Sequence, residues 1–155
     1  MVNYIQEGYN NITANLIVNG GLKAIEFYKK AFGAKDMGKA PFMMPDGKLG
    51  HAELIFGDSR IMLNDEFHDM GAFGPRAIGG TPVILYLYVQ DVDTTVRQAV
   101  GAGATLLKEP KDQFYGDRTA LLQDPFGHLW QIATHKEDVS EEEMSKRAAA
   151  MFKNK

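Results

Sequence analysis

The feature that most constrains the fold is an internal duplication. A strand, a helix and further strands follow one another in the first half of the chain, and the same order returns in the second half. Equivalent points keep nearly one offset, with 71 positions between Val18 and Val89 and 70 between Ala34 and Ala104. Such a repeat indicates two copies of one supersecondary unit. Because each copy has one helix for several strands, we expect one face of each sheet to be covered and the other to be open.

Hydrophobic periodicity supports this interpretation. Residues 12–18 and 83–89 alternate with a period of two, which is typical of strands. Apolar residues at helical spacing follow each strand and end at a glycine. Near the end of the chain, Ser140 and Glu143 have the spacing of a capping box, which predicts a further helix. We therefore predict a single α+β domain with a cupped mixed sheet, built from a βαβββ unit at 10–66, a linker at 67–80, a second βαβββ unit at 81–137 and a C-terminal helix at 138–155.

The composition limits the classes of function. The chain has 155 residues, of which 45% are hydrophobic and 24% charged, as in ordinary globular proteins. The net charge is −3 and basic residues do not cluster, so we expect neither nucleic acid nor a membrane as a partner. Cysteine is absent, which excludes disulfides and thiolate chemistry. The chain has no apolar run of about 20 residues and no signal-peptide pattern at its start, so we expect a cytoplasmic protein.

The strand faces predict where a ligand binds. In the first strand of each unit one face is uniformly apolar and should pack under the helix. The opposite face mixes aromatic with uncharged polar side chains, which is typical of a small-molecule pocket. The alternatives are a partly solvated sheet face and a contact between subunits. The predicted ligand-binding residues, including those of the neighbouring loops, are Thr13, Asn15, Asn64, Tyr86, Tyr88, Tyr115, Arg118 and Gln131.

Two residues are candidates for catalysis. His51 and Glu53 are two positions apart in one predicted strand, so their side chains share a face. Such a pair suits acid–base chemistry or two ligands of a displaced metal site. The alternative is an ordinary hydrogen-bonded pair on a strand. For His68 and His135 we expect exposed positions without a chemical role.

The segment DQFYGDR, residues 112–118, carries the densest group of reactive side chains. Arg118 could bind a carboxylate, phosphate or phosphonate through its planar guanidinium. The alternative is an internal brace, in which Arg118 pairs with Asp112, Asp117 or Asp124. We interpret Asp112 and Asp117 mainly as anchors of the loop.

Several motifs resemble the vicinal oxygen chelate superfamily, which includes glyoxalase I and the bleomycin and fosfomycin resistance proteins. They are the paired βαβββ pattern, AIEFYKKAFGA, YVQDVD and DPFGHLWQIATH. HAELIFGDSRIMLNDE and DQFYGDR more closely resemble its PhnB-like branch, also labelled 3-demethylubiquinone methyltransferase-like. The resemblance covers roughly residues 10–138 and implies paired units, a cup-shaped cavity and a homodimer.

Enzymes of that superfamily hold a divalent metal with His or Glu at four strand positions. By the motif match those positions carry Thr13, Met62, Ile84 and Gln131. None is a usual ligand of such an ion, so we expect no metal and no other cofactor. The resemblance thus implies a protein that binds a small, partly apolar molecule, with an anionic group as one option. The alternative is a lyase, isomerase or hydrolase that uses His51 and Glu53, with or without a divalent metal.

Overall fold

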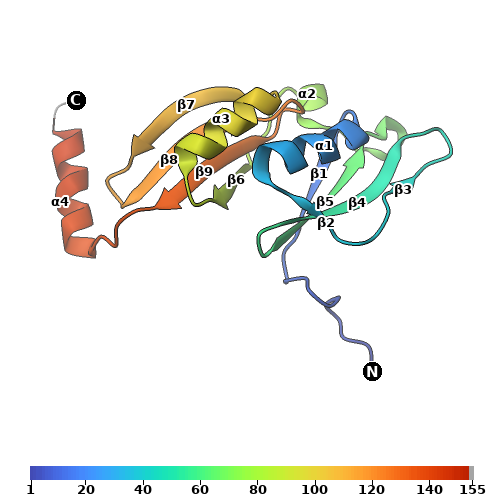
Figure 1. The fold of residues 1–155 in the computed structure, drawn as a ribbon, viewed down its shortest axis with the longest axis horizontal. Coiled ribbons are helices and arrows are strands. Elements are labelled where there is room, and N and C mark those ends of the chain that lie inside the picture. The colour runs from blue at the N-terminus through green and yellow to red at the C-terminus, as the bar shows by residue number, and fades with distance from the viewer. Residues whose placement is uncertain (154–155) are drawn as a thin grey trace. The chain divides into compact units, whose positions relative to one another are not determined.

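A computed structural model describes residues 1–153 as an α+β fold in which the predicted order of elements occurs twice (Figure 1). The chain forms two compact units. The first unit comprises Met1–Pro82 with Pro125–His128, and the second comprises Val83–Asp124 with Leu129–Lys155. In chain order the elements are β1 (Ala14–Val18), α1 (Gly21–Phe32), β2 (Lys35–Asp36), β3 (Phe42–Met43), β4 (Leu49–Phe56), β5 (Ser59–Asp65), η1 (His68–Met70), α2 (Pro75–Ile78), β6 (Ile84–Tyr88), α3 (Val92–Ala102), β7 (Thr105–Asp112), β8 (Asp117–Gln123), β9 (Leu129–His135) and α4 (Glu141–Phe152).

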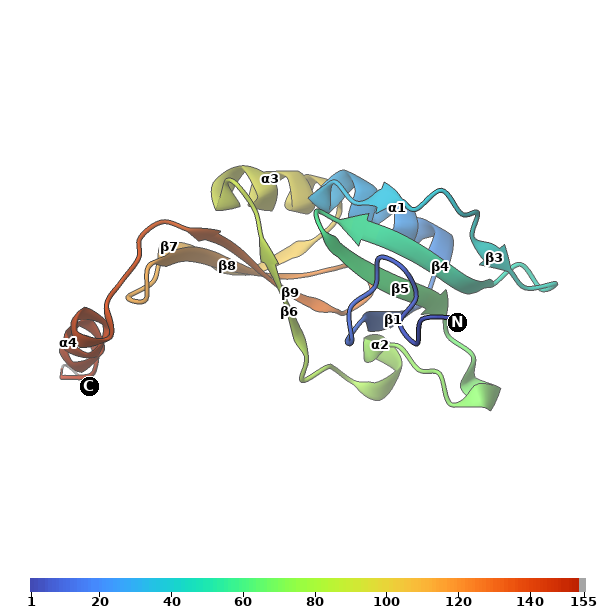
Figure 2. The same cartoon turned by 90° about the horizontal axis from the view of Figure 1, so that it is seen from below.

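The first unit is a mixed sheet with one helix against it. Its strand order is β1-β5-β4-β2, with β3 paired to β4, and β1 runs parallel to β5. Figures 1 and 2 show α1 over one face of this sheet. The core between them contains Tyr28, Leu54 and Leu63, all almost fully buried. The opposite face carries the alternate side chains of the same strands, because successive residues of a strand point to opposite sides.

The start of α1 depends on one carboxylate. Asp65, the last residue of β5, accepts hydrogen bonds from the backbone N–H groups of Gly20 and Gly21 at 2.8 Å through Oδ1. Its Oδ2 accepts from the backbone N–H of Leu49 at 2.7 Å. A Cβ atom on Gly21 would lie 2.5 Å from the side chain of Leu49, so this close approach requires glycine. Asp65 thereby joins β4, β5 and α1.

The second unit repeats the arrangement. Its strand order is β6-β9-β8-β7, and β6 runs parallel to β9. Figure 1 shows α3 over one face of this sheet. Between them lie Val96, Trp130 and Ile132, all buried, and the Trp130 indole donates to Asp124 at 2.9 Å. The capping predicted for the last helix is confirmed, because the Ser140 hydroxyl accepts from the backbone N–H of Glu143.

Both leading strands are shorter than the alternation predicted. Ile12 and Val83 were expected under the helices, but they precede β1 and β6 and are 90% and 60% exposed. The reason is pairing, because the parallel ladders begin at Ala14 opposite Ile61 and at Ile84 opposite Leu129. Thr13 likewise precedes β1. Among residues 1–153 no helix has the length and apolar character needed to cross a membrane.

Candidate functional site

The sheet face opposite α3 in the second unit carries a cluster of tyrosines around one carboxylate. The hydroxyls of Tyr86 and Tyr88, both on β6, donate to Oδ2 of Asp117 on β8 at 3.2 and 3.0 Å. The two rings lie 5.3 Å apart between centroids and are tilted by 47°. Tyr86 is 47% exposed and Tyr88 62% exposed, whereas Asp117 is only 5% exposed. The rings are therefore available to a ligand, while the carboxylate that holds them lies beneath.

Asp117 is also bound to a histidine. Nδ1 of His135 lies 2.7 Å from Asp117 Oδ1, and its Nε2 lies 2.8 Å from Asp138. An ionised carboxylate only accepts hydrogen bonds, so both ring nitrogens carry protons and His135 is an imidazolium. Asp117 and Asp138 raise the pKa of His135 accordingly. Burial alone would raise the pKa of Asp117, but hydrogen bonds from His135, Tyr88 and Tyr86 hold it below its usual value.

Further polar groups extend the same face. Gln131 on β9 is paired with Tyr86 on one side and with Leu121 on the other. Tyr115 lies near Tyr86. The pKa of Tyr86 is raised mainly by burial and next by the neighbouring Tyr115, so the phenol stays protonated. This surface is the tyrosine face, and it consists of Tyr86, Tyr88, Tyr115, Asp117, Gln131 and His135.

Arg118 does not join the tyrosine face. Its guanidinium donates to Asp93 on α3 at 2.7 and 3.0 Å and to Asp112 at 3.0 Å. Arg118 neighbours Asp117 on β8, so the two side chains point to opposite faces. In the structure Arg118 therefore forms an internal brace. Asp112 was among its expected partners, and Asp93 was not.

The open face of the first unit brings together a different set of predicted residues. Asn15 on β1 donates to Asn64 on β5 at 2.8 Å. On β4, Nε2 of His51 lies 3.2 Å from Oε1 of Glu53. The His51 side chain is 43% exposed and that of Glu53 only 11%. The geometry permits proton exchange between His51 and Glu53, as the acid–base interpretation requires.

Tyr9 limits access to that pair. Its ring lies under the Arg60 guanidinium, 4.9 Å from it, and Arg60 also donates to the backbone carbonyl of Glu7. The Tyr9 hydroxyl lowers the pKa of Glu53, and His51 lowers it further, although burial acts in the opposite direction. Burial and Glu53 in turn raise the pKa of Tyr9 to about 12. The Tyr9 hydroxyl and Glu53 Oε2 are both buried without a hydrogen-bond partner of standard geometry in the described part of the chain. Glu53 is thus shielded by the N-terminal segment.

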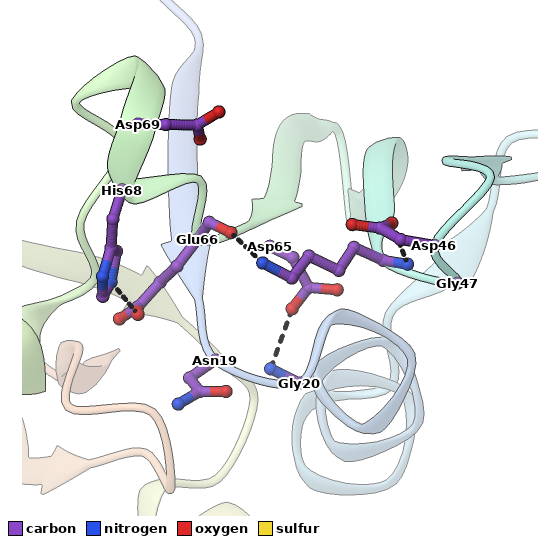
Figure 3. Close-up of a pocket in the computed structure, with 9 residues that line it drawn as sticks. Asn19, Gly20, Asp46, Gly47, Asp65, Glu66, His68 and Asp69 are labelled. Atoms are coloured by element: carbon purple, nitrogen blue, oxygen red, sulfur yellow. Dashed lines mark hydrogen bonds and ion pairs between the residues drawn. The ribbon is translucent and has the colours of Figure 1, made fainter.

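A pocket of about 580 Å³ lies where α1 begins (Figure 3). Carboxylates dominate its lining, and Asp46, Asp65 and Glu66 already have partners. Asp65 holds the backbone of α1, Glu66 accepts from the backbone N–H of Gly74 and lies 2.6 Å from His68, and the Lys48 ammonium donates to the Glu66 carbonyl. The residues lining the pocket are Asn19, Gly20, Asp46, Gly47, Lys48, Asp65, Glu66, His68 and Asp69. The internal bonds indicate that most of these groups serve the fold.

The positions that carry metal ligands in the resembled superfamily do not suit a divalent ion. Thr13 offers a hydroxyl, Met62 a thioether and Gln131 an amide, while Ile84 offers no donor atom. Nowhere in residues 1–153 do three or more histidine, aspartate or glutamate side chains group in a way that would hold a metal ion. The donor set at these four positions therefore does not fit a divalent metal.

Sequence reasoning did not connect Asp117 with His135. Asp117 was interpreted as a loop anchor and His135 as an exposed residue without a role. The structure pairs these residues directly across β8 and β9. A signal for His135 was present, because it lies an even number of residues from Gln131 on the same strand and therefore shares its face. His128 does not lie on the tyrosine face. Its Nε2 donates to the backbone carbonyl of Ile17 within the first unit.

Comparisons with known proteins agree with this architecture. A sequence model of the Glyoxalase/Bleomycin resistance protein/Dioxygenase superfamily matches residues 9–132. An uncharacterized protein of Mycobacterium bovis is 40% identical over 136 residues, which are 86% of this chain and 88% of that protein.

Solved structures show the same fold. A gene product of Arabidopsis thaliana aligns with a TM-score of 0.62 and 26% identity, over 81% of this chain and 98% of that chain. The fosfomycin resistance protein FosX of Mesorhizobium loti aligns with a TM-score of 0.58 over 84% of this chain and 93% of that chain. Its identity of 13% indicates similarity of fold alone.

Proposed function

Since the chain belongs to the Glyoxalase/Bleomycin resistance protein/Dioxygenase superfamily, as its motifs predicted, we propose that it binds a small, partly apolar molecule on the tyrosine face. The observation that carries this proposal is the pair of exposed rings of Tyr86 and Tyr88, both fixed by the buried carboxylate of Asp117. Fixed aromatic side chains with a few oriented polar groups are the usual composition of a ligand site. They lose little conformational entropy when a ligand binds.

The proposed binding needs no divalent metal. The residues at the superfamily's metal positions are poor ligands, whereas the tyrosine face has its own polar groups. Within the superfamily, the motifs HAELIFGDSRIMLNDE and DQFYGDR support assignment to the PhnB-like branch. A reaction that uses His51 and Glu53 is the second candidate function. The hydrogen bond between them favours it, and the shielding of Glu53 by Tyr9 opposes it.

A fragment screen tests the proposed binding. We expect small aromatic molecules to bind the wild-type protein in the presence of EDTA. The double variant Tyr86→Ala, Tyr88→Ala should bind them at least about tenfold more weakly, because two aromatic contacts are lost. Ligand-observed NMR with dissociation constants from titration measures the difference.

Tyr4→Ala is the matched control, since Tyr4 is exposed and lies outside the tyrosine face. This variant should bind like the wild type. A second double variant, Tyr86→Phe with Tyr88→Phe, keeps both rings and guards against a loss of folding in the alanine variant. Hits that persist unchanged in the alanine double variant, or that require added metal, would contradict the proposal.

We also propose that the protein forms a homodimer. Within the described part of the chain β6 is an edge strand, so one side of its backbone pairs with no other strand. Val83 just before it and Ile84 at its start are 60% and 49% exposed. Exposed apolar groups at a sheet edge favour association. Light scattering should give twice the chain mass, and Val83→Asp, which lies off the tyrosine face, should shift the protein toward the monomer. A monomer mass at every concentration would contradict the homodimer.

A further inference from the structure

Tyr86 and Tyr88 offer a ligand hydrogen-bond acceptors and π-electrons, because their hydroxyl protons point inward. The hydroxyls of Tyr86 and Tyr88 both donate to Asp117. Each phenol oxygen therefore has only lone pairs left for a ligand. The exposed ring faces carry the negative side of the aromatic quadrupole, which attracts cations.

The ionised groups bonded to these rings, directly or through Asp117, have a net negative charge, which also attracts a cation. Asp117 lies under both tyrosines as a carboxylate, and Asp138 lies on the far side of His135. With His135 as an imidazolium between the two carboxylates, these three groups sum to one negative charge. Tyr86 and Tyr88 themselves stay neutral, because burial and the neighbouring Asp117 and Tyr115 disfavour phenolate.

Two arginines of the second unit are already bound to carboxylates. Arg118 is bound by Asp93 and Asp112 behind the sheet, and Arg147 is bound by Glu137 and Glu143. Lys108 and Lys111 lie on β7, opposite Leu121 and Thr119. Strands β8 and β9 separate β7 from β6, so the backbone of these lysines lies about 14 Å from that of Tyr86 and Tyr88, whereas Asp117 lies on the neighbouring strand β8.

On these grounds we infer that the preferred ligand of the tyrosine face is a small organic cation, such as an alkylated or protonated amine. This inference rests on the proposed function and names its ligand class. The cation would lie against the rings of Tyr86 and Tyr88, with its charge above the Asp117 carboxylate. An anionic ligand at the same place would meet the lone pairs of both phenol oxygens and the charge of Asp117. The anionic group that the sequence left open, which depended on Arg118, loses its support.

Three probes of similar size and different charge test the inference. They are tetramethylammonium, neutral tert-butanol and the anion pivalate. Each is titrated into full-length protein in which the tyrosine rings are isotope-labelled, and the NMR shifts of Tyr86 and Tyr88 give the affinity. We expect tetramethylammonium to bind about tenfold more tightly than tert-butanol, because a cation gains the interaction with the ring faces. Pivalate should bind most weakly.

Two variants locate the source of this preference. Asp117→Asn removes the charge and keeps the shape and both rings, so it should lower the affinity ratio of cation to neutral probe. Tyr88→Leu keeps an apolar side chain without a π face at a largely exposed position, so folding is not at risk. It should weaken tetramethylammonium while leaving tert-butanol unchanged. Asp112→Asn, an exposed carboxylate bound to Arg118 on the opposite face, should keep the wild-type ratio.

The outcomes separate this inference from the proposed function. Equal or tighter binding of tert-butanol or pivalate at Tyr86 and Tyr88 would overturn the cation preference and leave the binding site standing. The absence of any shift at these tyrosines with all three probes would also overturn it. In that case the fragment screen decides the proposed function by itself.

Discussion

Replacing Asp65 by alanine is expected to lower the free energy of unfolding by about 3 kcal/mol. The Asp65 carboxylate accepts from three backbone N–H groups, those of Gly20, Gly21 and Leu49. Without it these donors are left unpaired in a partly buried place, and α1 loses the group that caps its first turn. Chemical denaturation followed by circular dichroism measures the change.

Two companion variants make the Asp65 result specific. Asp65→Asn keeps one acceptor oxygen, so it should cost about half as much as the alanine change. Asp69→Ala removes a carboxylate that lines the same pocket and is exposed, and its effect should stay within about 0.5 kcal/mol. Equal effects of Asp65→Ala and Asp69→Ala would contradict the assigned role of Asp65.

The second large effect is expected at Asp117. Alanine at this position removes the acceptor of Tyr86, Tyr88 and His135 at once. We expect a loss of about 2–3 kcal/mol in the free energy of unfolding, less than for a fully buried network because the three partners can regain water. Asp112→Ala is the control, since its ion pair with Arg118 is exposed and should contribute less than about 1 kcal/mol.

The contribution of His135 to that network depends on pH in a defined direction. Asp117, followed by Asp138, raises the pKa of His135 in the folded protein. The stabilisation is therefore complete below the unfolded pKa of about 6.5 and is lost as the pH rises through the higher folded value. The stability difference between wild type and His135→Asn should accordingly shrink as the pH rises from about 6.5 through the raised folded pKa. A difference that stays constant over this range would contradict the imidazolium assignment.

Local periodicity predicted much of the fold and part of the tyrosine face. Alternation with a period of two assigns Tyr86 and Tyr88 to one face of β6, because neighbouring side chains of a strand point in opposite directions. The same reasoning placed His51 beside Glu53. These relations involve residues two positions apart, so the sequence contains them directly.

The relations that the sequence did not yield depend on pairing between distant segments. Asp117 meets Tyr86 across 31 residues, and Arg118 meets Asp93 across 25. Both contacts follow from strand register and helix placement, which periodicity alone does not fix. Tyr9 comes from a segment without any periodic pattern, so its position over Glu53 had no sequence signal.

The central claim is that a small molecule binds the tyrosine face without a divalent metal. The most direct measurement is an NMR titration of protein labelled at the rings of its six tyrosines, with small aromatic amines in the presence of EDTA. The account predicts saturable shifts at Tyr86 and Tyr88, and an unmoved signal from Tyr28, which is buried in the first unit. Shifts confined to other tyrosines, or shifts that arise only after a divalent metal is added, would contradict it.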